Sequence, residues 1–166
     1  MMVDFLKTNW FQFEILCQTA LAMFLGALIG LDRELSKKPA GLRTHILVAG
    51  ASALIVKLTQ IAVTTFKSEF ATDLLRADPI RIFVAVITGI SFLGAGTIIR
   101  QGTGNKIEGL TTAASLLFSA VIGMGVALSQ YIISIGATIL ALFILLSLGK
   151  IEYWVSQRSN IKSKEN

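Results

Sequence analysis

The fold of this chain can be inferred from residues 26–44, which read Gly26-Ala-Leu-Ile-Gly-Leu-Asp-Arg-Glu-Leu-Ser-Lys-Lys-Pro-Ala-Gly-Leu-Arg-Thr44. The segment begins apolar, and Gly26 and Gly30 lie four residues apart, so they share a helix face that another helix can approach closely. Five of the seven residues 32–38 are charged. A proline and a glycine follow, and both break regular structure before a second apolar run begins. The segment therefore predicts a membrane exit, a tight charged hairpin and a re-entry.

The composition indicates a membrane protein. Of the 166 residues, 54% are hydrophobic and 15% are charged, whereas a soluble domain carries about 25% charged residues. The net charge of +5 is interpreted as loop cations that orient the chain and contact the lipid bilayer, so we expect no nucleic-acid partner. The single cysteine, Cys17, allows no internal disulfide and is expected to be a packing residue.

Five apolar runs are long enough to cross a bilayer as helices, which takes roughly 20 residues each. They lie at about 11–31, 42–65, 80–99, 110–128 and 131–149. We therefore predict an all-α fold, a polytopic membrane bundle of five transmembrane helices. Residues 1–150 form its transmembrane domain, and residues 151–166 form a short polar cytoplasmic tail.

The connections between the runs differ in character. Residues 66–79 are polar and are predicted to form a loop or a short surface helix. The loop at 100–108 contains Gly102, Gly104 and Asn105, so no regular structure is expected there. Only Ser129-Gln130 separate the last two runs, and this pair must form a tight hairpin.

The distribution of positive charge predicts the orientation in the membrane. One side receives Arg33, Lys37, Lys38, Arg43, Arg100, Lys106, Lys150, Arg158, Lys162 and Lys164, and the other receives Lys7, Lys67, Arg76 and Arg81. This asymmetry of ten to four places the first and third loops and the C-terminus in the cytoplasm, and the N-terminus outside.

Three glycine-rich blocks carry a family resemblance. They are Gly26-Ala-Leu-Ile-Gly-Leu-Asp-Arg-Glu34 with Ala40-Gly-Leu-Arg-Thr44, then Gly89-Ile-Ser-Phe-Leu-Gly-Ala-Gly96 with Arg100, and Gly109-Leu-Thr-Thr-Ala-Ala114. In this order they resemble the signature of the MgtC/SapB family of bacterial membrane proteins. Many members continue into a soluble cytoplasmic domain, so the resemblance implies a short form without that domain.

The resemblance also implies a function. It implies a multi-pass protein of the bacterial cytoplasmic membrane, in a family related to virulence, with a role in magnesium homeostasis or adaptation to low magnesium. The role would be exerted on other membrane machinery such as the ATP synthase. A homo-oligomer, for example a dimer, is expected. No cofactor is implied with certainty, and Mg²⁺ is the candidate ligand.

The residues themselves suggest a functional cytoplasmic cluster. Its members are Asp32, Arg33, Glu34, Arg43, Thr44, Arg100, Thr111 and Thr112. The structural interpretation is a salt bridge from Asp32 or Glu34 to Arg43 or Arg100 that pins the helix ends together. The functional alternative is a metal site in which Asp32 or Glu34 contacts hydrated Mg²⁺, which needs only one or two protein oxygens.

The start of the fourth span offers a second alternative. Thr111 or Thr112 is predicted to cap this helix, and the free N–H groups beside Arg100 would then suit an anion. The glycines on the first and third spans predict where these spans meet. We expect direct helix packing between them through Gly26, Gly30, Gly89, Gly94 and Gly96.

Two charged residues lie within the spans. Glu14 and Lys57 are expected to pair or to snorkel independently, with an ion relay as the alternative. His45 is interpreted as a hydrogen-bonded structural residue. No nucleophile lies beside a base, so we predict no enzyme and no catalytic residue. A protein that acts on other membrane machinery is the leading hypothesis, and a transporter or channel for Mg²⁺ or another small ion is the rival.

Overall fold

The computed structural model describes residues 2–70, 79–100 and 107–162, with side chains over 9–66, 80–98 and 108–147. Helices make up nearly all of it: α1 (Met2–Leu35), α2 (Leu42–Phe70), α3 (Pro79–Thr97), α4 (Leu110–Ala127) and α5 (Tyr131–Lys162). Two short strands, β1 (Ile99–Arg100) and β2 (Ile107–Glu108), join α3 to α4. The predicted helical fold is therefore confirmed.

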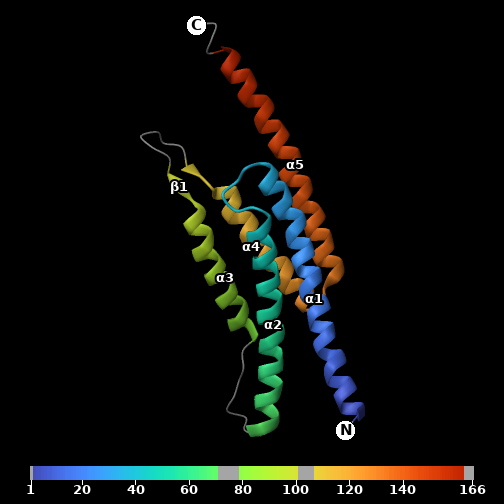
Figure 1. Ribbon diagram of the computed structural model, residues 1–166. Helices are drawn as coiled ribbons and strands as arrows, with labels where there is room; N and C mark the ends of the chain where they lie inside the picture. Colours follow the sequence, from blue (N-terminus) through green and yellow to red (C-terminus); the bar gives the residue numbers. More distant parts are fainter. Residues whose placement is uncertain (1, 71–78, 101–106, 163–166) are drawn as a thin grey trace.

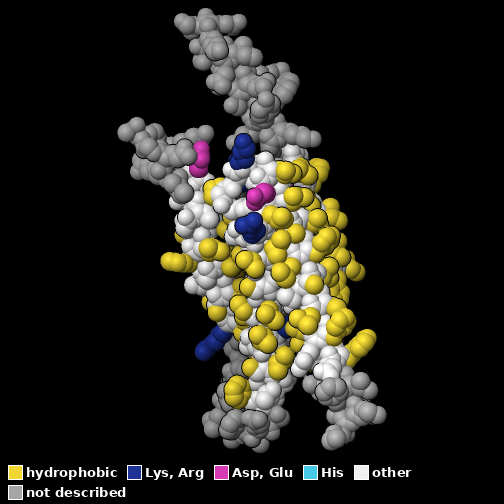
Figure 2. Space-filling view, in the orientation of Figure 1, with side chains coloured by type: hydrophobic (Ala, Val, Ile, Leu, Met, Phe, Trp, Pro, Cys, Tyr) yellow, Lys and Arg dark blue, Asp and Glu magenta, His cyan; other side chains and the backbone are white. Residues whose placement is uncertain are grey.

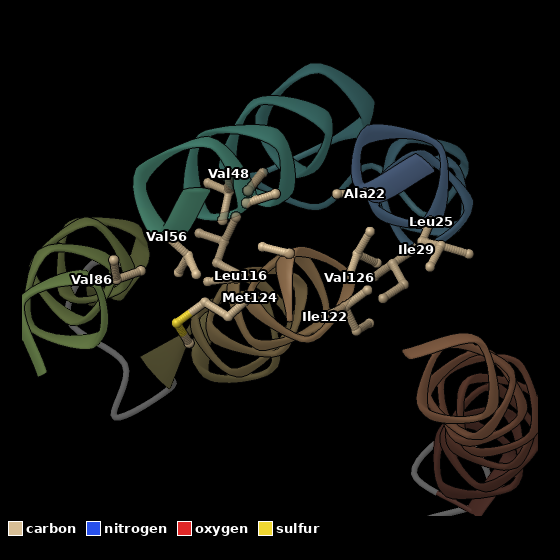
Figure 3. Packing of buried hydrophobic residues seen from close by; sticks show 14 residues of the cluster. Ala22, Leu25, Ile29, Val48, Val56, Val86, Leu116, Ile122, Met124 and Val126 are labelled. Carbon is tan, nitrogen blue, oxygen red and sulfur yellow. The ribbon is translucent and has the colours of Figure 1, made fainter. Parts of the chain in front are cut away.

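Helix α4 lies at the centre of the bundle and packs against each of the other four helices. Helices α1 and α2 form an antiparallel pair with the most extensive contact in the molecule. Figure 3 shows α1 and α3 on different sides of α4. The turn between α1 and α2 lies at the same end of the bundle as β1, which we call the hairpin end, and the turn between α4 and α5 lies towards the opposite, far end (Figure 1).

The core fills the space between α1, α2 and α4, with one contribution from α3 (Figure 3). Its larger members are Leu25, Ile29, Val48, Val56, Val86, Leu116, Ile122, Met124 and Val126. Many other apolar side chains point outward, such as Phe92 at 84% exposure and Ile132 at 88%. Figure 2 shows hydrophobic side chains over the middle of the bundle and charged ones towards its two ends. This distribution is typical of a surface that faces lipid.

Four helices are long and apolar enough to cross a membrane, judged by length and composition. The qualifying segments are Asn9–Leu35, Leu42–Phe66, Ile80–Thr97 and Leu110–Ala127. In α5, the apolar stretch within the described side chains is the shorter Tyr131–Ser147. Four of the predicted spans therefore coincide with helices that could cross a membrane, and the fifth predicted span coincides with this shorter stretch.

The two tight hairpins are built in the same way. The N–H groups of Lys37 and Lys38 donate to the carbonyls of Glu34 and Arg33, and Lys37 has a φ of 52°. At the end of α4, the N–H groups of Ser129 and Gln130 donate to Val126 and Gly125, and Ser129 has a φ of 61°. Each helix thus ends in a Schellman motif whose left-handed residue is not glycine. The hairpin predicted at Ser129-Gln130 is confirmed.

One loop prediction is wrong. Residues 100–108 were expected to lack regular structure, but β1 pairs with β2 in antiparallel fashion, with Ile99 opposite Glu108 and Arg100 opposite Ile107. The glycines and the asparagine of this loop all lie between the two strands or after them, so they do not interrupt the pairing. Upstream, α2 continues to Phe70, and the rest of the predicted surface segment, 71–78, lies outside the described residues.

The glycine faces meet different partners from those predicted. A Cβ on Gly26 would lie 2.6 Å from the His45 carbonyl oxygen, and a Cβ on Gly30 would lie 2.8 Å from the Leu42 Cα, so both glycines face α2. Gly94 faces Ala113 of α4 at 3.3 Å. Direct packing of the first span on the third is therefore wrong. The six-residue turn 36–41 brings α2 back against α1, and α4 takes the place beside α3.

The remaining two glycines of that prediction do not pack. A Cβ on Gly89 or on Gly96 would meet no described atom within 4 Å. Their positions on α3 are consistent with its low burial among the membrane-length helices.

Alanine substitutions will separate the two kinds of glycine. Gly26→Ala places a methyl group 2.6 Å from the His45 carbonyl oxygen and 2.8 Å from the Ala49 Cβ, so we expect a loss of about 1–3 kcal/mol through overpacking. Gly89→Ala should be neutral or stabilising by up to about 1 kcal/mol, because it only restricts an open helix position. Thermal unfolding in detergent measures both, and equal midpoints for the two variants would contradict the assigned packing.

Candidate functional site

A buried ion pair lies at the hairpin end of α1. The Arg33 Nε donates to the Asp32 Oδ2 at 2.9 Å, and the Arg33 Nη2 contacts the same oxygen. Arg33 is only 5% exposed. A buried guanidinium without a partner would be costly, so this pairing with the preceding residue neutralises the charge where the helix ends.

Glu34 performs a different task. Its Oε2 accepts the backbone N–H of Leu42 at 3.0 Å, which is one of the N–H groups that the start of a helix leaves without a partner. A carboxylate from α1 thus caps α2, and its charge also suits the positive end of the helix dipole. Gly41 makes the approach feasible, since a Cβ there would lie 1.8 Å from this oxygen.

The salt bridge predicted from Asp32 or Glu34 to Arg43 is not formed. The arginine that pairs is Arg33, because its own side chain reaches Asp32 without crossing the turn. Arg43 is exposed and makes no ion pair with another described side chain. For Arg100, the structure describes only the backbone, which lies in β1.

The threonines at the start of α4 are not caps. The N-cap is Gly109, with a φ of 95°, and no side chain caps it. A Cβ on Gly109 would lie 2.1 Å from the Thr97 carbonyl oxygen, so glycine is required by both conformation and space. Thr112 is buried and Thr111 is exposed, while Thr44 at the start of α2 is half-buried.

His45 joins three helices just inside the cluster. It is fully buried; its Nδ1 donates to the Gly41 carbonyl at 2.8 Å, and its Nε2 lies 3.0 Å from the Ser115 Oγ of α4. Gly30 of α1 makes room for it, because a Cβ there would lie 2.9 Å from the His45 Cβ. Its interpretation as a hydrogen-bonded structural residue is confirmed, but sequence reasoning did not identify Ser115 as its partner.

The two intramembrane charges do not meet. Glu14 and Lys57 form no ion pair within the described residues, and Glu14 instead accepts a hydrogen bond from the Gln18 Nε2 at 3.2 Å. The predicted pair is therefore wrong, and independent snorkelling stays a prediction. Gln18 was not identified from the sequence, although it is one of the few long polar residues inside a span.

The carboxylates at the hairpin fit only one kind of metal contact. Across the described residues, no group of three or more His, Cys, Asp or Glu side chains is placed to hold a metal ion. Asp32 Oδ1 and Glu34 Oε1 make no hydrogen bond to a described residue. Each leaves one oxygen for a water of hydrated Mg²⁺, which is bound through one or two carboxylates and keeps most of its water.

The arrangement defines a multi-helix membrane protein whose polar groups concentrate at a charged hairpin. Comparison with known proteins identifies its family, because residues 19–154 match the family model described as MgtC family. The chain therefore belongs to the MgtC family, and the family resemblance of its three glycine-rich blocks is confirmed.

Three relatives have similar sequence identity to this chain. The chain is 36% identical over 137 residues to protein MgtC of Salmonella typhimurium, covering 82% of this chain and 53% of the relative. It is 35% identical over 132 residues to the putative magnesium transporter YhiD of Escherichia coli, covering 80% and 59%. It is 34% identical over 118 residues to protein SapB of Bacillus subtilis, covering 71% and 49%.

The chain thus spans about half to three-fifths of the length of these relatives. No solved structure matches it.

Removal of the Glu34 carboxylate should loosen the hairpin. Glu34→Ala leaves the Leu42 N–H without its side-chain acceptor, and we expect a loss of about 1 kcal/mol, as for other helix caps. Glu34→Gln keeps an acceptor oxygen and should retain most of the stability. Thermal unfolding in detergent compares them, and an unchanged midpoint for Glu34→Ala would show that the cap has no energetic role.

Removal of the Ser115 hydroxyl should lower the stability of the fold more than removal of another buried serine hydroxyl. Ser115→Ala leaves the His45 Nε2 buried without a partner, which costs about 1–3 kcal/mol. Ser52→Ala is the matched control, since the Ser52 hydroxyl donates only to the Val48 carbonyl of its own helix, and its loss should cost about 1 kcal/mol or less. Chemical unfolding of both variants measures the difference. Similar losses in the free energy of unfolding would mean that the contact with His45 adds no stability beyond that of an ordinary serine hydrogen bond.

Proposed function

We propose that this MgtC-family protein lies in the bacterial cytoplasmic membrane and supports growth at low magnesium by contact with other membrane machinery. The hairpin cluster of residues 32–44 is the proposed contact surface. The ATP synthase is the proposed example of such machinery, and this choice rests on the family resemblance alone. In this proposal the protein acts by binding and catalyses no reaction.

The ion pair and hydrogen bonds that hold the hairpin are the observation that carries the proposal. Asp32 is paired with Arg33, Glu34 caps α2, and His45 ties the start of α2 to α4. The exposed charges Lys37, Lys38 and Arg43 are therefore presented on a fixed turn. A preordered surface loses less conformational entropy on binding than a flexible loop does.

The polar side chains inside the spans give less support to a pore. Buried hydroxyls of Ser52, Ser134 and Thr138 donate to carbonyls of their own helices, so they are already satisfied and do not need a passing ion. The charged side chains of the hairpin cluster lie at one end of the bundle and not at its middle (Figure 2). These features favour a binding protein over a transporter.

A magnesium transporter remains the second candidate function. The relative from Escherichia coli is itself named a putative magnesium transporter. Two buried polar atoms, Gln18 Oε1 and Ser119 Oγ, have no hydrogen-bond partner among the described residues. Unsatisfied polar atoms within the spans are the feature that a polar path for an ion would need.

The orientation belongs to the proposal as well. The excess of basic residues at the hairpin end, together with the positive-inside tendency, supports a cytoplasmic hairpin and an N-terminus outside.

Growth and flux measurements test the two candidates together. The double variant Asp32→Asn, Glu34→Gln keeps the shape of both side chains but leaves the buried Arg33 without its carboxylate, so its folding is first checked by thermal unfolding in detergent. We expect the folded double variant not to restore growth at limiting magnesium in a strain that lacks its own family member. Glu108→Gln, an exposed acid at the same end, is the control and should restore growth.

The same proteins in liposomes with an enclosed Mg²⁺ indicator should give no flux. Robust flux from the unmodified chain would favour the transporter. Normal growth of the folded double variant would show that the hairpin acids are not the contact surface.

A further inference from the structure

A second polar cluster lies away from the hairpin, where α1 passes the turn between α4 and α5. Its members are Glu14 and Gln18 of α1, Ser129 of the turn and Tyr131 at the start of α5. Gln18 precedes Arg33 by 15 residues of continuous helix, or about 22 Å at 1.5 Å per residue. This group, which we call the far-end cluster, is therefore separate from the hairpin cluster.

Three oxygen atoms surround the Gln18 amide nitrogen. The Nε2 lies 2.8 Å from the Tyr131 hydroxyl, 3.2 Å from the Glu14 Oε1 and 3.5 Å from the Ser129 Oγ. An amide nitrogen carries only two hydrogens, so it cannot donate to all three oxygens at once. The position it occupies is thus richer in acceptors than a neutral amide requires.

The other side of the same amide is unsatisfied. Gln18 is 4% exposed, and its Oε1 has no hydrogen-bond partner among the described residues. Turning the amide over does not solve the problem, because it would place Oε1 beside the Glu14 carboxylate and leave the nitrogen unpaired. A buried polar atom without a partner calls for a specific explanation, such as a water molecule or an ion.

We propose that the far-end cluster binds a hard cation through oxygen atoms. The Glu14 carboxylate supplies the negative charge, and the Gln18 carbonyl and the hydroxyls of Ser129 and Tyr131 supply neutral oxygens, the ligand types that Mg²⁺ and Ca²⁺ take in proteins. For the Gln18 carbonyl to be a ligand, the amide must turn over, which brings Oε1 to the side of the three oxygens that now surround Nε2. A cation bound there offsets the repulsion between Oε1 and the Glu14 carboxylate. The exposure of Glu14 and Ser129 leaves the cluster open to ions from the far end.

The number of charged ligands in the cluster sets its affinity for the cation. One carboxylate among neutral oxygens gives weak binding, with a dissociation constant on the order of 10⁻⁴–10⁻³ M, as in other sites of low ligand charge. The bound cation ties α1 to the turn between α4 and α5. It therefore stabilises the bundle in proportion to its occupancy.

Thermal unfolding of the full chain in detergent tests this, with MgCl₂, CaCl₂, NaCl and KCl compared at constant ionic strength. At cation concentrations about tenfold above the dissociation constant, we expect the midpoint to rise by roughly 2–5 °C. Glu14→Gln and Tyr131→Phe should each abolish the rise. Gln12→Leu, at an exposed position on the same helix, and Asp32→Asn, in the hairpin cluster, should both keep it.

A rise with the divalent salts only assigns the site to Mg²⁺ or Ca²⁺, and a rise with the sodium or potassium salt assigns it to a monovalent ion. No cation-specific rise, or a rise that Glu14→Gln keeps and Asp32→Asn loses, would overturn the proposal. If Glu14→Gln does not fold, Tyr131→Phe gives the same readout. The side-chain amide signal of Gln18 in ¹⁵N NMR provides an independent check, since it must shift on cation addition if its carbonyl is a ligand.

Discussion

The close contact between α1 and α2 is the constraint on which the rest of the structure depends. Within a bilayer the hydrophobic effect does not drive helices to associate. The helices must therefore fit closely and satisfy their polar groups among themselves. Gly26 and Gly30 provide the fit, because they let the backbone of α2 approach α1 at His45. The imidazole can then reach Ser115, which fixes α4 against the pair.

The same constraint explains the ends of the helices. At the hairpin end, the Asp32 carboxylate neutralises the buried Arg33, and the exposed Glu34 carboxylate caps α2. Both tight turns place a residue other than glycine in the left-handed conformation, Lys37 in one and Ser129 in the other. Such a residue costs about 1–2 kcal/mol, and the backbone hydrogen bonds of each turn offset that cost.

Much of this architecture can be predicted from the sequence, because hydropathy and chain breakers are local signals. The spans and both tight hairpins follow from run lengths and from the residues between the runs. The partners of the glycines do not follow, since Gly94 has the same appearance whether it faces α1 or α4. Likewise, nothing in the spacing distinguishes a salt bridge to Arg43 from one to Arg33, and a single Ser115 or Gln18 in a span resembles an ordinary packing residue.

Polar contacts hold α4 near its start and just beyond its end. Near its start, Ser115 is bound to His45, and just beyond its last residue the turn is bound to Gln18 through Ser129 and Tyr131. Between these points α4 packs closely against α1 and α2, as at Gly123, where a Cβ would lie 2.1 Å from the Ala49 carbonyl oxygen. A displacement of α4 along its axis would strain this packing and break polar contacts at both ends together. The polar groups at the two ends of the bundle are therefore mechanically linked through one helix.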